Sequence, residues 1–152
     1  MANTYTQLLV HVVFSVKFRE RLIKESFRII LEKYICGIIS NKDCKPLAIY
    51  CNPDHCHILI GLNPSVSISH LMQSVKANST EFIKRNFWTG GHFAWQGGYG
   101  AFSVDRDRMG IVVRYILNQP NHHRKRTFQE EYQNMLKAYE IEFDEKYLFE
   151  FF

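Results

Sequence analysis

The chain has 152 residues, of which 46% are hydrophobic and 14% aromatic, and its formal net charge is +4 at pH 7. This length fits one compact domain over residues 1–152 and argues against a second catalytic domain. The hydrophobic content is sufficient for a packed core, which argues against an intrinsically disordered chain. Because the positive charge is small, it does not by itself establish nucleic-acid binding.

The sequence lacks the features of a membrane or secreted protein. The longest apolar run, residues 8–14, contains His11 and is far shorter than the roughly 20 residues that a membrane span needs. No secretory signal pattern is visible at the N-terminus. The four cysteines include no Cys-x-x-Cys pair, and a chain of this size does not need disulfides. We therefore expect a cytoplasmic protein that has no membrane contact and carries reduced thiols.

Alternation of apolar and polar residues defines the first half of the chain. Residues 8–17 have the alternation of a strand, whereas residues 25–39 carry apolar side chains at helical spacing. Residues 46–51 and 55–62 predict two further strands, which pair antiparallel because the turn-forming triplet Asn-Pro-Asp at 52–54 joins them.

Capping and chain-breaking residues define the second half. A helix is expected over residues 67–86, with a serine as its N-cap, and a fourth strand with a turn or bulge over the glycine-interrupted stretch 93–102. A third helix over 105–119, capped by its aspartate, should end where Pro120 disfavours helical geometry in the preceding residue. A last helix begins at Thr127, which has a glutamate at capping-box spacing.

The predicted order strand-helix-strand-strand-helix-strand is that of the split βαβ arrangement. We therefore expect an α+β, ferredoxin-like fold, similar in plan to an RNA-recognition module. Its antiparallel sheet would carry helices on one face and additional C-terminal helices.

His55 and His57 lie two positions apart on the third predicted strand, so both side chains project from the same face. Two imidazoles in this arrangement can converge on one cation. Cys56 points to the opposite face, which places it in the core and argues against it as a ligand. The same spacing also fits two polar residues on an exposed strand, and imidazole suits zinc as well as other divalent ions. The residues alone leave the metal and its presence open.

Tyr115 and Gln119 lie four positions apart on the third predicted helix and therefore share a face. A tyrosine there is often an ordinary surface residue. A phenol, with an unperturbed pKa of about 10, attacks phosphorus poorly unless a cation polarises the phosphate and another group accepts the proton. A metal site nearby would therefore give this tyrosine a chemical role.

Basic residues form clusters at Lys17 and Arg19 and, most densely, at residues 122–126. Such clusters are either solvated surfaces or contacts for a nucleic-acid backbone.

Several longer segments surround these residues: HVVFSVKFRERL, NPDHCHILIGL, FAWQGGYGAFSV, RYILNQPNHHRKRTFQEEY and IEFDEKYLFE. Together they resemble the HUH transposases with a single catalytic tyrosine, found in bacterial insertion sequences and including the REP-associated tyrosine transposases. The segments occur in the family's order over nearly the whole chain. Cys56 departs from the family pattern, which usually has a bulky hydrophobic residue between the two histidines.

The resemblance implies a metal-dependent DNA transposase. Tyr115 would attack a phosphodiester of single-stranded DNA, giving a 5′-phosphotyrosine and a free 3′-hydroxyl that can later reseal the DNA. His55, His57 and Gln119 would bind Mg²⁺ or Mn²⁺. No nucleotide cofactor is expected, which agrees with the lack of a GxxxxGK[ST] phosphate loop in the sequence.

The resemblance also implies partners. The substrate would be single-stranded DNA with a hairpin, its backbone held by the basic residues Lys17, Arg19, Arg124, Lys125 and Arg126. A homodimer would share a sheet, and the tyrosine helix of one subunit would complete the other's metal site, so Tyr115 could act in cis or in trans. The apolar, proline-free strand at 8–17 is a candidate edge for this pairing.

Two alternatives compete with this interpretation. A non-catalytic binder of single-stranded nucleic acid would use sheet aromatics such as Phe93, Trp95, Tyr99 and Phe102 as a stacking platform, although aromatics in such a stretch are commonly core residues. A domesticated REP-associated nuclease would have the same chemistry as the transposase without mobilising its own gene.

Overall fold

The computed structural model describes residues 3–86, 88–122 and 127–143. Its sheet has the strand order β2-β3-β1-β4, and every neighbouring pair is antiparallel. The strands are β1 (Leu9–Ser15), β2 (Lys45–Cys51), β3 (His55–Gly61) and β4 (Gly100–Val104). Because β3 lies between the parallel strands β1 and β2, the predicted split βαβ arrangement is confirmed.

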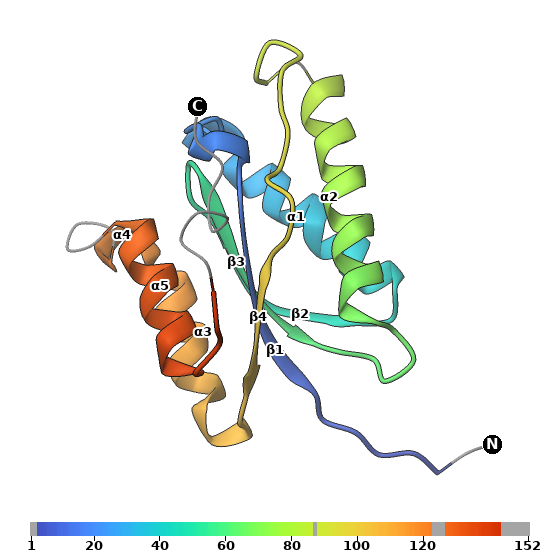
Figure 1. Ribbon diagram of the computed structural model, residues 1–152. Coiled ribbons are helices and arrows are strands. Elements are labelled where there is room, and N and C mark those ends of the chain that lie inside the picture. Colours follow the sequence, from blue (N-terminus) through green and yellow to red (C-terminus); the bar gives the residue numbers. More distant parts are fainter. Residues whose placement is uncertain (1–2, 87, 123–126, 144–152) are drawn as a thin grey trace.

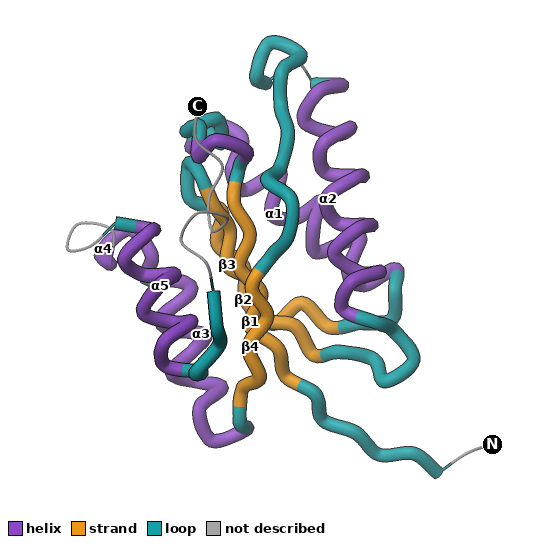
Figure 2. The backbone as a smooth tube through the Cα atoms, in the orientation of Figure 1, coloured by secondary structure: helices purple, strands orange, loops and turns teal. Residues whose placement is uncertain are grey.

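Helices cover both faces of this sheet (Figures 1 and 2). The first pair is α1 (Glu25–Asn41) and α2 (Ile68–Arg85), and the C-terminal group is α3 (Met109–Leu117), α4 (Gln119–His122) and α5 (Phe128–Ala138). The first pair packs on one face, while α3 and α5 lie on the other. The predicted fold class, with its additional C-terminal helices, is therefore confirmed. No helix in the described part of the chain has the length and apolar content needed to cross a bilayer.

The alternation of strand residues separates two cores. Side chains such as Val12, Phe14 and Cys56 point toward α1 and α2, where they join the largest hydrophobic cluster. Val13, one position away on β1, instead joins Phe102 and residues of α5 on the other face. Since neighbouring strand residues point to opposite faces, the histidines beside Cys56 must lie in the layer of α3 and α5.

Two predicted helix caps are present as expected. The Ser67 side chain accepts a hydrogen bond from the backbone N–H of His70 at 3.2 Å, and α2 ends at the C-cap Asn86. The Thr127 hydroxyl accepts one from the backbone N–H of Glu130 at 3.2 Å. Each cap satisfies a backbone donor that the first helical turn leaves unpaired.

The prediction of one helix over residues 105–119 is wrong at both ends. Asp105 precedes a 3₁₀ turn, η2 (Arg106–Arg108), and makes no side-chain capping bond among the described contacts. The following helix α3 ends at Leu117, and Asn118 leaves helical geometry with φ −103° and ψ 21°. Pro120 supplies the reason, since it lacks the N–H that would continue the hydrogen-bond ladder.

The fourth strand is shorter than predicted. Regular pairing of β4 begins at Gly100, and the preceding aromatic stretch makes one isolated bridge, between Val16 and Trp95. Gly98 adopts φ +84°, a left-handed conformation that interrupts an extended strand. The Trp95 indole N–H donates to the Ser79 hydroxyl at 2.9 Å, so this stretch is fixed by side-chain contacts with α2.

The expectation that residues 8–17 form an edge strand is also wrong. β1 pairs with β3 on one side and with β4 on the other, which leaves β2 and β4 at the edges. β1 is apolar because helices cover both of its faces, which is the usual reason for a continuous apolar strand.

The aromatic residues proposed as a stacking platform are mostly core residues. Phe93, Trp95 and Phe102 are 2%, 8% and 2% exposed, and Tyr99 packs against the largest cluster. The alternative function, a non-catalytic binder of single-stranded nucleic acid, required these aromatic side chains to be exposed on the sheet, and they are not. The cysteines are free thiols, as expected for Cys36, Cys44, Cys51 and Cys56.

Gly100 allows α5 to approach the sheet closely. A Cβ atom at this position would lie 2.7 Å from Cε1 and 2.8 Å from the hydroxyl oxygen of Tyr132. Real Cβ atoms do not approach other heavy atoms so closely, so the absence of a side chain at residue 100 makes room for the Tyr132 ring.

Candidate metal and nucleophile site

The two histidines of β3 lie side by side beneath the C-terminal helices. His55 and His57 are 1% and 0% exposed, and their ring centroids are 5.1 Å apart. Both face the layer of α3 and α5, whereas Cys56 between them belongs to the opposite core. The prediction that the histidines share a face, with Cys56 turned away, is confirmed.

Glu131 of α5 completes a group of potential metal ligands. Its Oε1 atom lies 3.0 Å from Nε2 of His57 and 3.5 Å from Nε2 of His55. One ligand atom from each of the three residues lies within 4.8 Å of the others. Two imidazoles and one carboxylate are a donor set that binds divalent metal ions, and all three residues are buried. The residues present therefore fit a divalent cation.

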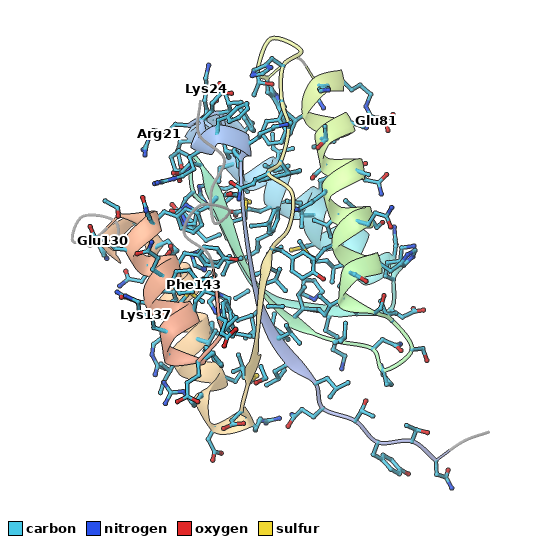
Figure 3. The ribbon with its side chains drawn as sticks, viewed as in Figure 1. Arg21, Lys24, Glu81, Glu130, Lys137 and Phe143 are labelled. Atoms are coloured by element: carbon cyan, nitrogen blue, oxygen red, sulfur yellow. The ribbon has the colours of Figure 1, made fainter. Side chains whose placement is uncertain are left out.

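The sequence interpretation did not identify Glu131. It lies three positions after Phe128 and five before Leu136, and all three side chains are buried. Its neighbour Glu130 lies on the outer side of α5, as does Lys137 (Figure 3). The sequence pattern that could have identified Glu131 is a carboxylate on the apolar face of an amphipathic helix. A buried charge in such a position requires a partner.

His55 is oriented by a carboxylate. Its Nδ1 lies 2.7 Å from Oδ1 of Asp54, whose Oδ2 is 3.7 Å from Nη2 of Arg19. Burial would raise the pKa of Asp54, but the hydrogen bond with His55 and the nearby arginine lower it overall. Burial likewise opposes the charged form of His55, yet Asp54 and Glu131 raise its pKa above the ordinary value. Asp54 thus keeps a hydrogen on Nδ1, and Nε2 faces Glu131.

His57 has a different neighbour, a third histidine. Nδ1 of His57 lies 2.9 Å from Nε2 of His11, a β1 residue that is 5% exposed. Burial and the proximity of His57 lower the pKa of His11 to about 3, although Glu131 acts in the opposite direction. His11 is therefore neutral near pH 7 and can either donate or accept one hydrogen at Nε2.

Tyr115, the predicted nucleophile, lies beside the histidines of its own chain. Its hydroxyl donates a hydrogen bond to Oε2 of Glu131, and its ring centroid is 5.8 Å from that of His57. The half-buried ring also packs with Ile116 against the sheet. The Glu131 carboxylate therefore bridges the tyrosine and the histidine pair.

Gln119, the predicted third ligand, is fully buried next to this group. Its Oε1 accepts a hydrogen bond from Nδ2 of Asn52 at 3.2 Å, and that Nδ2 lies 3.1 Å from Nε2 of His55. Its own Nε2 donates to the backbone carbonyl of Tyr115 at 3.3 Å. The helix break before Pro120 thus leaves Gln119 at the site, connected to His55 through Asn52.

Only some of the predicted DNA contacts can be placed. Lys17 and Arg19 belong to a 3₁₀ turn, η1 (Lys17–Arg19), where the Arg19 guanidinium lies 5.7 Å from the centroid of the Phe128 ring. Phe128 in turn stacks on His55 with centroids 3.8 Å apart. This turn therefore lies at the margin of the histidine site. The other three predicted contacts lie outside the described residues: Arg124, Lys125 and Arg126.

Comparisons with known proteins agree on one family. The sequence profile of the family "Transposase IS200 like" matches residues 4–119. The ISDra2 transposase TnpA of Deinococcus radiodurans is 22% identical over 120 residues, covering 74% of this chain and 84% of that protein. The transposase for insertion sequence element IS200 of Salmonella typhimurium is 23% identical over 130 residues, covering 72% and 86%.

Solved structures share the fold. A candidate transposase from Deinococcus radiodurans has a TM-score of 0.63 at 21% identity, covering 78% of this chain and 95% of that one. A REP-associated tyrosine transposase bound to a REP hairpin has a TM-score of 0.59 at 16% identity, covering 81% and 73%. Since the family profile spans most of the described chain, this protein belongs to the IS200-like family of DNA transposases.

Proposed function

We propose that this transposase cleaves and rejoins single-stranded DNA through a 5′-phosphotyrosine formed on Tyr115, with the help of Mg²⁺ or Mn²⁺. The observation that carries the proposal is the shared carboxylate: Glu131 contacts the Tyr115 hydroxyl with one oxygen and both histidines with the other. The proposed nucleophile and the proposed metal ligands thus lie together within one chain.

His55, His57 and Glu131 would hold the cation, and Gln119, which is connected to His55 through Asn52, is the proposed further ligand. The bound ion would supply Lewis-acid polarisation of the scissile phosphate. Magnesium and manganese suit the carboxylate and amide oxygens of this set.

The protein's own groups account for the covalent step. The Tyr115 oxygen attacks phosphorus, a P–O bond to tyrosine forms, and the bond to the 3′ oxygen breaks. The phenolic hydrogen already points at Oε2 of Glu131, which can accept it. The departing 3′ oxygen takes a proton from water and becomes a hydroxyl, and the hydroxide left behind is neutralised by the proton that Glu131 then releases. Rejoining reverses these steps, so the ester energy is conserved and no nucleotide cofactor is needed.

The proposed substrate is single-stranded DNA with a hairpin, as suggested by the relative of the same fold that was solved with a REP hairpin. Lys17, Arg19 and the basic residues Arg124, Lys125 and Arg126 would contact its phosphates. We also propose a homodimer. The closeness of Tyr115 to its own histidines supports action in cis, and pairing of strands would use the edges β2 or β4.

The function can be tested by incubating the wild-type protein with a labelled hairpin oligonucleotide that carries single-stranded flanks. With Mg²⁺ or Mn²⁺ we expect a covalent protein–DNA adduct on a denaturing gel. EDTA should abolish the adduct, because the phosphate is no longer polarised, and excess Mn²⁺ should restore it. Adduct formation in EDTA at the same rate would contradict metal dependence.

Replacement of Glu131 by glutamine should weaken Mn²⁺ binding by about 10- to 100-fold, since the side chain keeps an oxygen ligand but loses its charge. Electron paramagnetic resonance of free Mn²⁺ measures this affinity directly. Glu130→Gln is the matched control, because Glu130 is exposed and should leave the affinity unchanged. Equal affinities of the Glu131→Gln variant and the wild type would remove Glu131 from the ligand set.

A further inference from the structure

The two histidines of the site have chemically different outer partners. Nδ1 of His55 faces the carboxylate of Asp54, which can only accept a hydrogen while it is ionised. Nδ1 of His57 faces Nε2 of His11 at 2.9 Å, and an imidazole nitrogen can either donate or accept. Which ring nitrogen of His57 carries its hydrogen therefore depends on whether Nε2 of His11 donates or accepts in this contact.

The distances around His57 favour one arrangement of its hydrogens in the metal-free protein. Nε2 of His57 lies 3.0 Å from Oε1 of Glu131, a distance at which a hydrogen on this nitrogen would be donated to the carboxylate. With its hydrogen on Nε2, a neutral His57 has a lone pair on Nδ1. His11 must then donate from its own Nε2 to complete the pair.

If His57 and Glu131 held a cation, the direction of this hydrogen bond would be reversed. Nε2 of His57 would have to present its lone pair to the ion, so the ring's one hydrogen must lie on Nδ1. That hydrogen needs an acceptor in a buried site, and Nε2 of His11 lies 2.9 Å from Nδ1. An imidazole satisfies both states, whereas a carboxylate could accept but not donate.

We propose that His11 is a positioning residue that accepts the Nδ1 hydrogen of His57 and so directs Nε2 of His57 at the cation. The inference rests on the proposed metal-dependent function. In this exchange His57 takes a hydrogen on Nδ1 from His11 and releases its Nε2 hydrogen to solvent, while His11 gains one from solvent on Nδ1. Each ring keeps one hydrogen, and the net charge of the pair is unchanged.

The position of His11 in the sheet supports this role. β1 is hydrogen-bonded on both sides, and its register places His11 opposite Leu59 and Val13 opposite His57. His11 is therefore the diagonal neighbour of His57 on the same face. Its ring also lies edge-on to Phe102 and Tyr115, with centroids 6.3 and 6.2 Å away. These contacts hold the imidazole in place.

Two substitutions separate the hydrogen bond from simple packing. His11→Leu fills similar space without an acceptor, and His11→Gln places an amide oxygen or nitrogen near the former Nε2. We expect Mn²⁺ affinity, measured by paramagnetic resonance, to fall about 10- to 100-fold in His11→Leu. His11→Gln should retain most of the affinity. His92→Gln, at a histidine whose side chain is 68% exposed, is the control and should behave as wild type.

A second readout reports the hydrogens themselves. In ¹⁵N-labelled protein, long-range ¹H–¹⁵N spectra should show His57 protonated on Nε2 without metal and on Nδ1 when saturated with diamagnetic Mg²⁺. A metal-bound His57 that keeps its Nε2 hydrogen would overturn the proposal, as would equal losses of affinity in the leucine and glutamine variants. Unchanged Mn²⁺ affinity in His11→Leu, with normal binding by the wild type, would overturn this inference alone. A wild-type protein that does not bind Mn²⁺ would overturn the proposed function as well.

Discussion

The Tyr115→Phe variant should form no covalent adduct with hairpin DNA, a loss of about 10⁴-fold or more. Phenylalanine preserves the ring that packs with Ile116 against the sheet, so the fold should persist. It removes only the oxygen that would bond to phosphorus and the hydrogen that faces Glu131. Denaturing gels measure the adduct, and fluorescence anisotropy in EDTA should give an unchanged affinity for the hairpin.

Tyr50→Phe provides a matched control for this experiment. Tyr50 packs in the same hydrophobic cluster as Tyr115, but it lies on β2, and the Arg28 guanidinium is 4.4 Å from the centroid of its ring. This variant should cleave like the wild type. An adduct that persists in Tyr115→Phe would show that another side chain is the nucleophile.

The His57→Ala variant should lose about 10³-fold in cleavage rate, because Lewis-acid stabilisation by a bound ion is worth several kcal/mol. The substitution removes one ligand and leaves Glu131 and His11 without their common neighbour. Hairpin binding, which depends on contacts with phosphates, should change little. Single-turnover cleavage and anisotropy measured on the same preparation separate the two effects.

His70→Ala is the control for His57→Ala. His70 lies in the first turn of α2, is exposed, and faces Lys42 at 3.5 Å. Its replacement should affect neither cleavage nor binding. If His57→Ala lost hairpin binding as strongly as cleavage, the histidine would have a structural role, and thermal unfolding of the variant should then show a matching loss of stability.

Local patterns were sufficient to predict much of the fold. Side-chain alternation placed His55 and His57 on one face, and the caps at Ser67 and Thr127 fixed where two helices begin. These features depend on a residue and its near neighbours in the chain. Tyr115 and Gln119 were proposed from their spacing on one predicted helix and from the family resemblance, but the structure divides them between α3 and α4.

Contacts between distant segments were beyond such patterns. Glu131 lies 74 positions from His57 and reaches it only because α5 folds back over the sheet. His11 lies 46 positions from His57 and meets it through the register of β1 with β3. Alternation predicts that β1 is a strand but not which strands flank it, and the edge assignment for residues 8–17 was wrong for that reason.

Gly100 connects the packing of α5 to a residue of the site. The Tyr132 ring that occupies the space above Gly100 stacks on Phe128, with centroids 5.6 Å apart, and Phe128 stacks on His55. Any side chain at position 100 would displace the first ring of this series, and the displacement would be passed to the histidine. A substitution at position 100 would therefore change the position of the His55 ring without replacing any of the proposed metal ligands.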